Sequence, residues 1–172
     1  MKHSLRRDLC ILLASALVLC LLTSCGEKGQ KTVQTEAAVG ESLSTMFFDF
    51  TVNTAQRVAS YEDYAPQQPE PALVLLNITV TNTAQQAVTM YDSDFTLAYG
   101  DGAQDFAWIY DAFTDAMQPA EETINAGESR TYDLLFPVPQ DKTDFVLRYT
   151  ETYKEDAGEQ TTGETFRVTF HA

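Results

Sequence analysis

The chain has 172 residues, of which 11 are Lys or Arg and 25 are Asp or Glu, so its formal net charge at pH 7 is −14. This negative field repels the phosphates of nucleic acids and anionic lipid headgroups, which excludes nucleic-acid binding. The acidity is typical of a soluble surface, and it leaves attraction of cationic ligands open as an unspecific alternative.

The N-terminus has the pattern of a secretory signal. Three basic side chains precede an apolar run, Leu9–Leu22, of 14 residues. A membrane-spanning helix needs roughly 20 apolar residues, so this run is too short to span comfortably. A basic start, a short apolar stretch and small residues after it predict a cleaved signal peptide over residues 1–24.

The cleavage point resembles the lipobox of bacterial lipoproteins, since Leu22-Thr23-Ser24-Cys25 is followed by Gly26. In that family the cysteine thiol receives a diacylglycerol with fatty acids such as palmitate, and the cysteine becomes the new N-terminus. The resemblance implies that Cys25 is the lipidation site and that its lipid holds the protein on the extracytoplasmic face of a bacterial membrane. The alternative is an ordinary secreted protein in which Cys25 has no role.

Signal removal changes the composition. Cys10 and Cys20 lie in the apolar run, so Cys25 is the only cysteine left and no intramolecular disulfide can form. Three basic residues and one acidic residue also leave, so 8 basic and 24 acidic side chains remain and the formal charge becomes −16. Residues 26–45 are polar and lack aromatics, which predicts a flexible linker. The segment 25–45 is therefore expected to consist of the lipidated Cys25 followed by this linker. Residues 46–172 suit one domain with one core.

The strongest strand signal is Leu73–Thr83, the longest apolar, β-branched run after the signal. Apolar side chains alternate along it with polar ones, so one face is predicted to meet the core. The residues on that face are Val74, Leu76, Ile78 and Val80. A first strand is predicted at Met46–Asn53, and the segment between the two, Thr54–Ala72, is predicted to be a long loop with prolines near its end.

Shorter strands follow the central one. Val88–Tyr91 and Phe95–Tyr99 are predicted strands, and Gly100-Asp101-Gly102 predicts a hairpin turn after the second. Residues 104–117 fit both strand and helix spacing; the prediction is a strand at Phe106–Tyr110, then a helical turn or loop from Asp111. Residues 119–127 are predicted to be loop.

The C-terminal part predicts three more strands. They are Glu128–Val138, Phe145–Thr150 and Phe166–Phe170, with a charged hairpin loop at Glu151–Gly163. About seven or eight short alternating strands with turn residues between them predict an all-β, antiparallel, immunoglobulin-like β-sandwich.

Several of these segments together resemble a known group. They are LVLLNITVTNTAQQAV from residue 73, DFTLAYGDG from residue 94, INAGESRTYDLLFPVP from residue 124 and FVLRY from residue 145. This pattern resembles the telokin-like, immunoglobulin-fold domain of many bacterial lipoproteins of unknown function. That family usually has Pro-Gly-Glu where this chain has Ala126-Gly127-Glu128. The resemblance covers residues 46–172 and implies a surface-exposed, non-enzymatic domain with no assigned ligand.

Reactive groups are scarce after the signal. His171 is the only histidine there, and Cys25 is expected to be acylated, so nucleophilic triads and zinc clusters are not predicted. No Gly-rich phosphate loop is present, and no cofactor is predicted. Carboxylates remain as weak calcium candidates, for which solvated charge is the preferred interpretation; they are Asp92, Asp94, Asp101 and Asp105. The adjacent pair Glu121-Glu122 is likewise interpreted as solvated charge in a loop.

The candidate ligand-binding segment is Phe106–Phe113, F-A-W-I-Y-D-A-F. Rings occupy both alternating faces of this segment, and one core cannot easily bury both faces, so some of the rings are expected at the surface. Exposed rings with a nearby carboxylate can bind sugars, peptides or cations. The candidate binding residues are Trp108, Tyr110, Asp111 and Phe113. The favoured alternative is that Phe106 and Trp108 close one end of the core.

Together these features predict a non-catalytic binding or adaptor module whose partner is a cell-envelope protein or glycan. One alternative is a structural envelope component or accessory subunit without a small ligand. Another is a carboxylate-based hydrolase acting on envelope glycans, which would need two acids that converge in a cleft.

Overall fold

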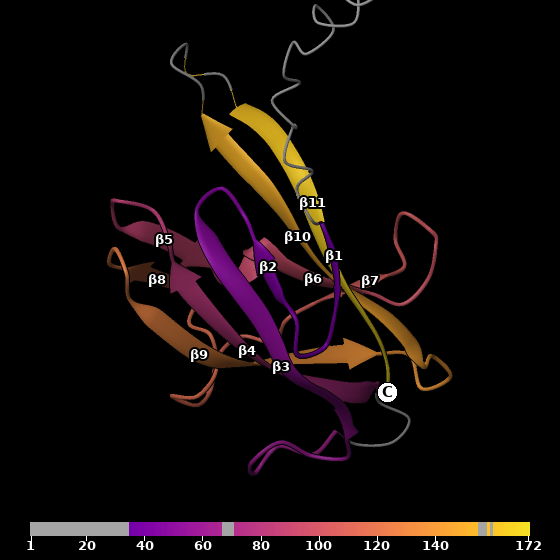
Figure 1. Ribbon diagram of the computed structural model, residues 1–172. Helices are drawn as coiled ribbons and strands as arrows, with labels where there is room; N and C mark the ends of the chain where they lie inside the picture. Colours follow the sequence, from indigo (N-terminus) through magenta and orange to yellow (C-terminus); the bar gives the residue numbers. More distant parts are fainter. Residues whose placement is uncertain (1–34, 67–70, 155–157, 159) are drawn as a thin grey trace, which may run out of the picture. The chain divides into compact units, whose positions relative to one another are not determined.

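Two β-sheets face each other in the computed structural model, which describes residues 35–66, 71–154, 158 and 160–172 (Figure 1). One sheet has the strand order β1-β11-β10-β6-β7 and the other the order β2-β3-β4-β9. The first contains β1 (Glu36–Ala38), β6 (Phe95–Ala98), β7 (Phe106–Trp108), β10 (Asp144–Lys154) and β11 (Gln160–His171). The second contains β2 (Ser42–Ser44), β3 (Phe48–Val58), β4 (Ala72–Asn82) and β9 (Ser129–Val138). The predicted β-sandwich is therefore confirmed.

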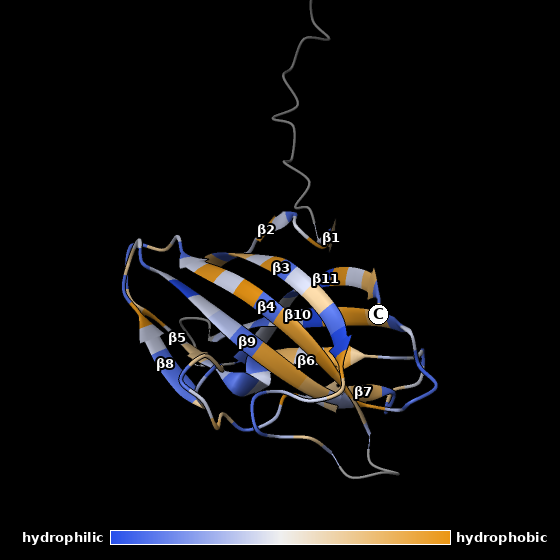
Figure 2. Ribbon diagram, turned by 90° about the horizontal axis from the view of Figure 1, so that it is seen from below, coloured by the Kyte–Doolittle hydropathy of each residue, from blue (hydrophilic) through white to orange (hydrophobic). Residues whose placement is uncertain are grey.

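A small third sheet pairs β5 (Val88–Tyr91) with β8 (Glu121–Ile124). A single turn of 3-10 helix, η1 (Asp92–Asp94), joins β5 to β6. Hydrophobic residues are concentrated along β4, β9 and β10, while β8 and many connecting segments are hydrophilic (Figure 2). The hydrophobic core therefore lies between the two larger sheets.

Aromatic rings fill the space between the two sheets. The ring of Phe48 in β3 lies 4.8 Å from that of Tyr149 in β10, and the ring of Phe50 lies 5.7 Å from that of Phe95 in β6. All four side chains are buried. Offset and edge-on contacts of this kind add about 0.5–1.5 kcal/mol to the burial of each ring pair.

The predicted central strand is confirmed as β4. It pairs with β3 on one side and β9 on the other, and the four side chains predicted to face the core, Val74, Leu76, Ile78 and Val80, are all fully buried. Leu73 is buried as well, but it belongs to a second cluster with Tyr61, Met117 and Leu135. The face of β4 that points away from the main core is thus apolar only at its start, where Tyr61 and Met117 pack against it.

Asn82, the last residue of β4, links the end of that strand to the Gly127-Glu128 turn. Its amide nitrogen donates hydrogen bonds to the carbonyls of Gln86 and Ile124, both at 2.8 Å, and its side-chain oxygen accepts one from the Ala84 N–H. The Gly127 N–H donates to the Asn82 carbonyl at 2.9 Å, and Gly127 has φ +78°, which disfavours other residues there. These motifs hold the fold and carry no reactive chemistry.

The predicted hairpin at the Asp-Gly turn is confirmed, because β6 and β7 pair antiparallel. The Asp105 carboxylate accepts a hydrogen bond from the Gly102 N–H at 2.9 Å. A Cβ atom at Gly100 or Gly102 would lie 2.5 or 2.7 Å from that carboxylate, so glycine leaves the room that Asp105 needs. Asp105 is therefore a turn residue.

The prediction of a linker over residues 25–45 is wrong for its C-terminal part. β1 and β2 lie there, β1 pairs in parallel with β11, and Leu43 is buried in the core. The parallel pair also departs from a purely antiparallel sandwich. Residues 25–34, including Cys25, lie outside the described residues.

Other boundaries were also predicted incorrectly. β3 continues through Val58 into the predicted loop, with a bulge between Val52 and Thr54. β8 replaces part of the predicted loop at 119–127, and β10 and β11 extend into the predicted loop at 151–163. The described residues therefore form eleven strands, where seven or eight were predicted.

Candidate functional site

The aromatic segment 106–113 divides between two places in the fold. β7 is an edge strand in which Ala107 is buried, whereas the side chain of Trp108 is 54% exposed. The Trp108 ring packs edge-on against the ring of Phe106, with centroids 5.3 Å apart. The favoured interpretation, in which Trp108 closes the core, is therefore wrong.

The residues after β7 form a strap, defined here as residues 109–118, which runs beside β9. The Tyr110 N–H donates to the Leu135 carbonyl at 2.8 Å, and the Asp133 N–H donates to the Ala116 carbonyl at 2.8 Å. Met117 forms a parallel bridge with Asp133 and is buried. The strap thus bonds to backbone groups of β9, the last strand of its sheet. The predicted strand Phe106–Tyr110 ends already at Trp108, and of the two predicted forms for the segment from Asp111, helical turn or loop, the structure has the loop.

Rings gather where the strap meets the loop after β3. Tyr61 and Tyr64 each pack against the Phe113 ring, with centroids 5.8 and 5.9 Å apart, and the Tyr64 and Tyr110 hydroxyls lie 3.2 Å apart. The Tyr61 hydroxyl donates to the Asp133 carboxylate at 2.9 Å. Burial raises the pKa of Tyr61, and the hydrogen bond to Asp133 raises it further. Phe113 remains 49% exposed, so this ring platform holds it at the surface.

Beside Phe113 lies a hollow of about 600 Å³, here called the Phe113 hollow. It lies between the strap and the neighbouring strands β8 and β9. Its most informative lining residues are Phe113, Thr114, Asp115, Glu122, Arg130 and Tyr132. The hollow therefore combines an exposed ring with hydroxyls and with side chains of both charges.

The polar wall of the Phe113 hollow is held by hydrogen bonds. One oxygen of Glu122 accepts from the Arg130 guanidinium at 2.9 Å, and the other accepts from the Tyr132 hydroxyl. Arg130 also contacts the Glu128 carboxylate at 3.2 Å. Burial raises the pKa of Tyr132, and the Glu122 carboxylate raises it further. Glu122 lies in a strand and is paired, so its interpretation as solvated loop charge is wrong.

The predicted binding residues do not form one site. Phe113 lines the hollow and Tyr110 supports its platform, but Asp111 is exposed and does not line the hollow, and Trp108 lies on β7. The carboxylates that do line it, Asp115 and Glu122, were not predicted as binding residues. Nor was Arg130, because its place beside the strap depends on pairing between distant segments.

Two of the four weak calcium candidates, Asp94 and Asp105, accept backbone hydrogen bonds. Asp94 accepts the Tyr91 N–H at 2.8 Å, Asp105 supports its own turn, Asp101 lies at the tip of the β6–β7 loop, and Asp92 belongs to η1. Across the described ranges, no three or more His, Cys, Asp or Glu side chains gather in a way that could hold a metal ion. In the same part of the chain, no helix is both long and apolar enough to cross a bilayer.

Two facing sheets with a short end sheet and a covering strap define a β-sandwich protein. More particularly, the chain belongs to the family described as a domain of unknown function, DUF4352, whose model matches residues 37–159. No functionally curated protein matches the chain. The family is thus described without a function.

Solved structures share this fold. A candidate lipoprotein, ycdA, from Bacillus subtilis is 22% identical with a TM-score of 0.54, over 74% of this chain and 38% of that one. The secreted protein MPT63 from Mycobacterium tuberculosis is 16% identical with a TM-score of 0.52, over 80% of this chain and 96% of that one. A β-sandwich protein from Clostridium difficile is 16% identical with a TM-score of 0.47, over 78% and 93%. The chain therefore spans well under half the length of ycdA and nearly all of MPT63.

Proposed function

We propose that this protein is a lipid-anchored, extracytoplasmic binding module of a bacterial envelope, with a telokin-like, immunoglobulin-like domain presented outside the cytoplasm. The anchor rests on the lipobox Leu22–Cys25. The binding role rests on one observation, which is that Phe113 remains half-exposed beside a hollow whose polar wall is already hydrogen-bonded. A fixed ring beside fixed polar groups gives contact area at low entropic cost.

The ligand class that fits is a sugar or peptide of a cell-envelope partner. The Phe113 ring offers a flat apolar surface, Arg130 offers donors, and Asp115 and Glu122 offer acceptors. Sugars and peptides both present an apolar face flanked by groups that donate and accept hydrogen bonds. The partner and the membrane thus meet two different parts of the chain, the hollow and Cys25.

We also propose that the module is non-catalytic. The hydrolase alternative has a cleft, because Asp115 and Glu122 line the same hollow. However, both oxygens of Glu122 already accept hydrogen bonds from protein side chains, Arg130 and Tyr132. A catalytic carboxylate must meet the substrate with one of its oxygens, so this engagement opposes the role. Release of sugars from envelope glycans, lost in Asp115→Asn, would establish the hydrolase instead.

Two variants test the anchor and the hollow separately. Cys25→Ser should leave the protein uncleaved or release it from membranes, whereas a processed and membrane-bound variant contradicts the anchor. Phe113→Ala should weaken capture of the partner by cross-linking on intact cells, and Trp108→Ala is the matched control because it removes an equally exposed ring elsewhere. Equal capture by the two variants supports the alternative of a structural or accessory component.

A further inference from the structure

A second hollow lies at the end of the sandwich where β5 and η1 approach β10. Its volume is about 330 Å³, and it is here called the Tyr149 pocket. The turn between β2 and β3 forms one wall, β5 and η1 form another, and β10 forms the third. Its main lining residues are Phe47, Tyr91, Asp94, Tyr149, Thr150 and Thr152. None of these residues lines the Phe113 hollow.

Aromatic rings supply much of the wall of the Tyr149 pocket. Tyr149 is 6% exposed and packs against Phe48, which also lines the pocket, while Phe47 is half-buried. Tyr91 is 45% exposed, so its ring is accessible at the mouth. The faces of such rings carry negative charge density, which attracts cations.

A carboxylate lies among these rings. One oxygen of Asp94 accepts the Tyr91 N–H at 2.8 Å, which fixes the side chain in the wall. Burial raises the pKa of Asp94, and burial together with the nearby carboxylates of Asp94 and Glu151 raises that of Tyr149. No Lys or Arg is among the described residues that line the pocket. The negative charge at this wall therefore has no basic neighbour in the pocket.

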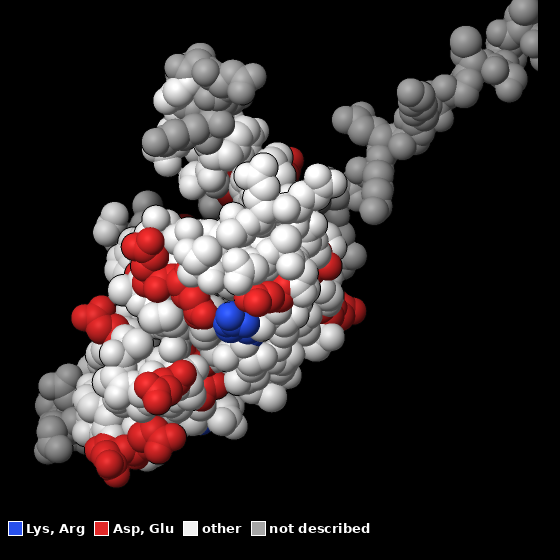
Figure 3. Space-filling model, turned by 90° about the vertical axis from the view of Figure 1, so that its left-hand side faces the viewer, with Lys and Arg blue, Asp and Glu red and all other residues white. Residues whose placement is uncertain are grey.

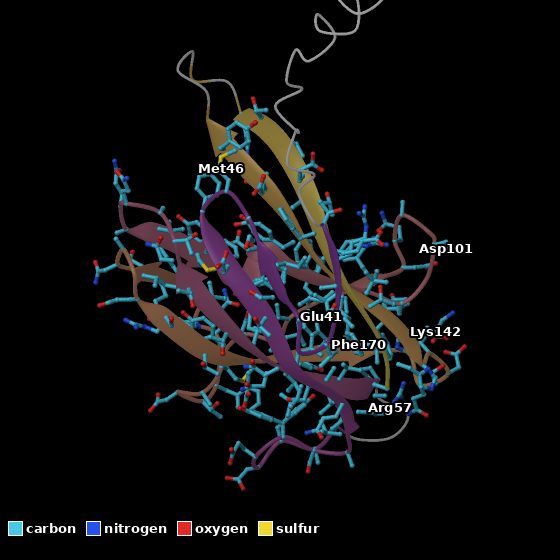
Figure 4. The ribbon with its side chains drawn as sticks, in the orientation of Figure 1. Glu41, Met46, Arg57, Asp101, Lys142 and Phe170 are labelled. Carbon is cyan, nitrogen blue, oxygen red and sulfur yellow. The ribbon has the colours of Figure 1, made fainter. Side chains whose placement is uncertain are left out.

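A bulge in β11 lies beside the pocket, opposite Glu151 of β10. The register between the two strands shifts between Thr150 and Thr152, so that Gly163 and Glu164 of β11 oppose the single residue Glu151. Glu151 is buried, and its carboxylate accepts the Met46 N–H at 2.6 Å. Met46 lies in the turn joining β2 to β3, toward the end of the domain that carries the β10–β11 hairpin (Figure 4). This bond holds the turn that carries Phe47 against the pocket.

Two details show how the buried Glu151 and the turn before β3 are accommodated. A Cβ atom at Gly163 would lie 2.8 Å from the second carboxylate oxygen of Glu151, so a glycine on β11 leaves room for this buried acid. Thr45 completes the turn, because its hydroxyl accepts the N–H groups of Phe47 and Phe48 at 3.2 and 3.0 Å. The wall is thus fixed before any ligand arrives.

The long-range electrostatic field of the chain is negative, like the Asp94 carboxylate in the wall of the pocket. The formal charge of the chain is −14, and the face shown in Figure 3 carries many Asp and Glu side chains and a single small patch of Lys or Arg. Such a field raises the local concentration of cations and lowers that of anions. A ligand that enters the Tyr149 pocket is therefore selected for positive charge before it makes contact.

We propose that the Tyr149 pocket binds an organic ammonium cation. The cationic group lies against the rings of Phe47, Tyr91 and Tyr149, and the Asp94 carboxylate supplies the counter-charge. The volume suits a small ligand rather than a macromolecular surface. This site is independent of the Phe113 hollow and of the partner proposed for it.

The test is calorimetric titration of the mature lipidated protein, in a non-ionic detergent at constant ionic strength. Choline and n-butylammonium represent quaternary and primary ammonium groups, and neohexyl alcohol is the uncharged carbon isostere of choline. At least one cation should bind saturably at one site, and the tighter of the two identifies the ammonium type. Neohexyl alcohol should bind about tenfold more weakly or worse, because it lacks both the cation–π attraction and the ion pair.

Variants locate the binding. Asp94→Asn should lower the affinity about tenfold, and Tyr91→Leu should lower it severalfold while Tyr91→Phe preserves it. Tyr91 is exposed, so its variants keep the test valid even if Asp94→Asn does not fold; Trp108→Ala, a ring outside the pocket, should bind as the wild type does. Absence of saturable binding by both cations, equal binding of neohexyl alcohol, or unchanged affinity in Tyr91→Leu overturns the proposal.

Discussion

Replacing Asn82 by Leu should destabilise the domain strongly, although leucine has a similar size and β4 is rich in apolar residues. The Asn82 side chain satisfies three backbone groups, the carbonyls of Gln86 and Ile124 and the N–H of Ala84. The bond to Ile124 is fully buried, and the other two are partly buried. The variant would leave all three groups without this partner.

The expected magnitude follows from that environment. An unsatisfied buried group costs about 1–3 kcal/mol, and a bond that water can partly replace costs about 0.5–1.5 kcal/mol. The variant should therefore lose about 2–6 kcal/mol of unfolding free energy, a large fraction of the roughly 5–15 kcal/mol typical of a domain.

Urea unfolding followed by circular dichroism measures this loss, provided that the dependence on denaturant is unchanged. Thr81→Ala is the control, because the Thr81 hydroxyl forms an exposed hydrogen bond with the Ser129 hydroxyl, at 2.8 Å. It should cost no more than about 1 kcal/mol. If Asn82→Leu costs as little as Thr81→Ala, the assigned role of Asn82 is refuted.

Two further predictions concern the core and its titration. Ile78→Ala should lower the unfolding free energy by about 2–5 kcal/mol, because the Ile78 side chain is fully buried. Thr79→Ala, on the opposite face of β4, should lower it much less. Equal and small losses for both variants in urea unfolding would contradict the register of β4. Unfolding free energy should also fall as the pH rises above about 10, because tyrosine in the unfolded chain ionises there whereas folding raises the pKa of Tyr132 and Tyr149. Above pH 10, each of the two tyrosines lowers the unfolding free energy by up to about 1.4 kcal/mol per pH unit. Tyr132→Phe should therefore make the fall with pH less steep. An unfolding free energy that stays constant above pH 10 would count against the burial of these tyrosines.

The strands that sequence alone predicts well are those with a strong local pattern. β4 carries apolar side chains at every second position from Val74 to Val80, and β9 does so from Tyr132 to Val138, so their period of two shows without knowledge of the neighbours. β1 and β2 lack this signal, because Leu43 is the only fully buried residue in them and β1 forms by parallel pairing with the distant β11. β8 is equally short and polar, with Ile124 alone buried.

The candidate sites depend on contacts that no spacing rule reveals. Some rings near residue 110 are exposed, as expected, but Trp108 is one of them although the favoured interpretation placed it at the end of the core, and it lies on β7 whereas Phe113 lies in the strap. The Phe113 hollow also needs Arg130 from β9, and the Tyr149 pocket joins Phe47 to β5 and β10. These residues meet only through strand pairing across the sandwich, so their chemistry was visible in the sequence but their proximity was not.

The central claim, that the Phe113 hollow contacts an envelope partner, is tested most directly by a photoreactive amino acid placed at Ala112. This residue is exposed and lines the hollow, so intact cells should yield a discrete cross-linked adduct after illumination. The same photoreactive group at Asp101, exposed on the β6–β7 loop, provides the matched control (Figure 4). The account predicts an adduct from position 112 that disappears when Phe113 is also changed to Ala, and none from position 101. No adduct from position 112, or the same adduct from both positions, would contradict it.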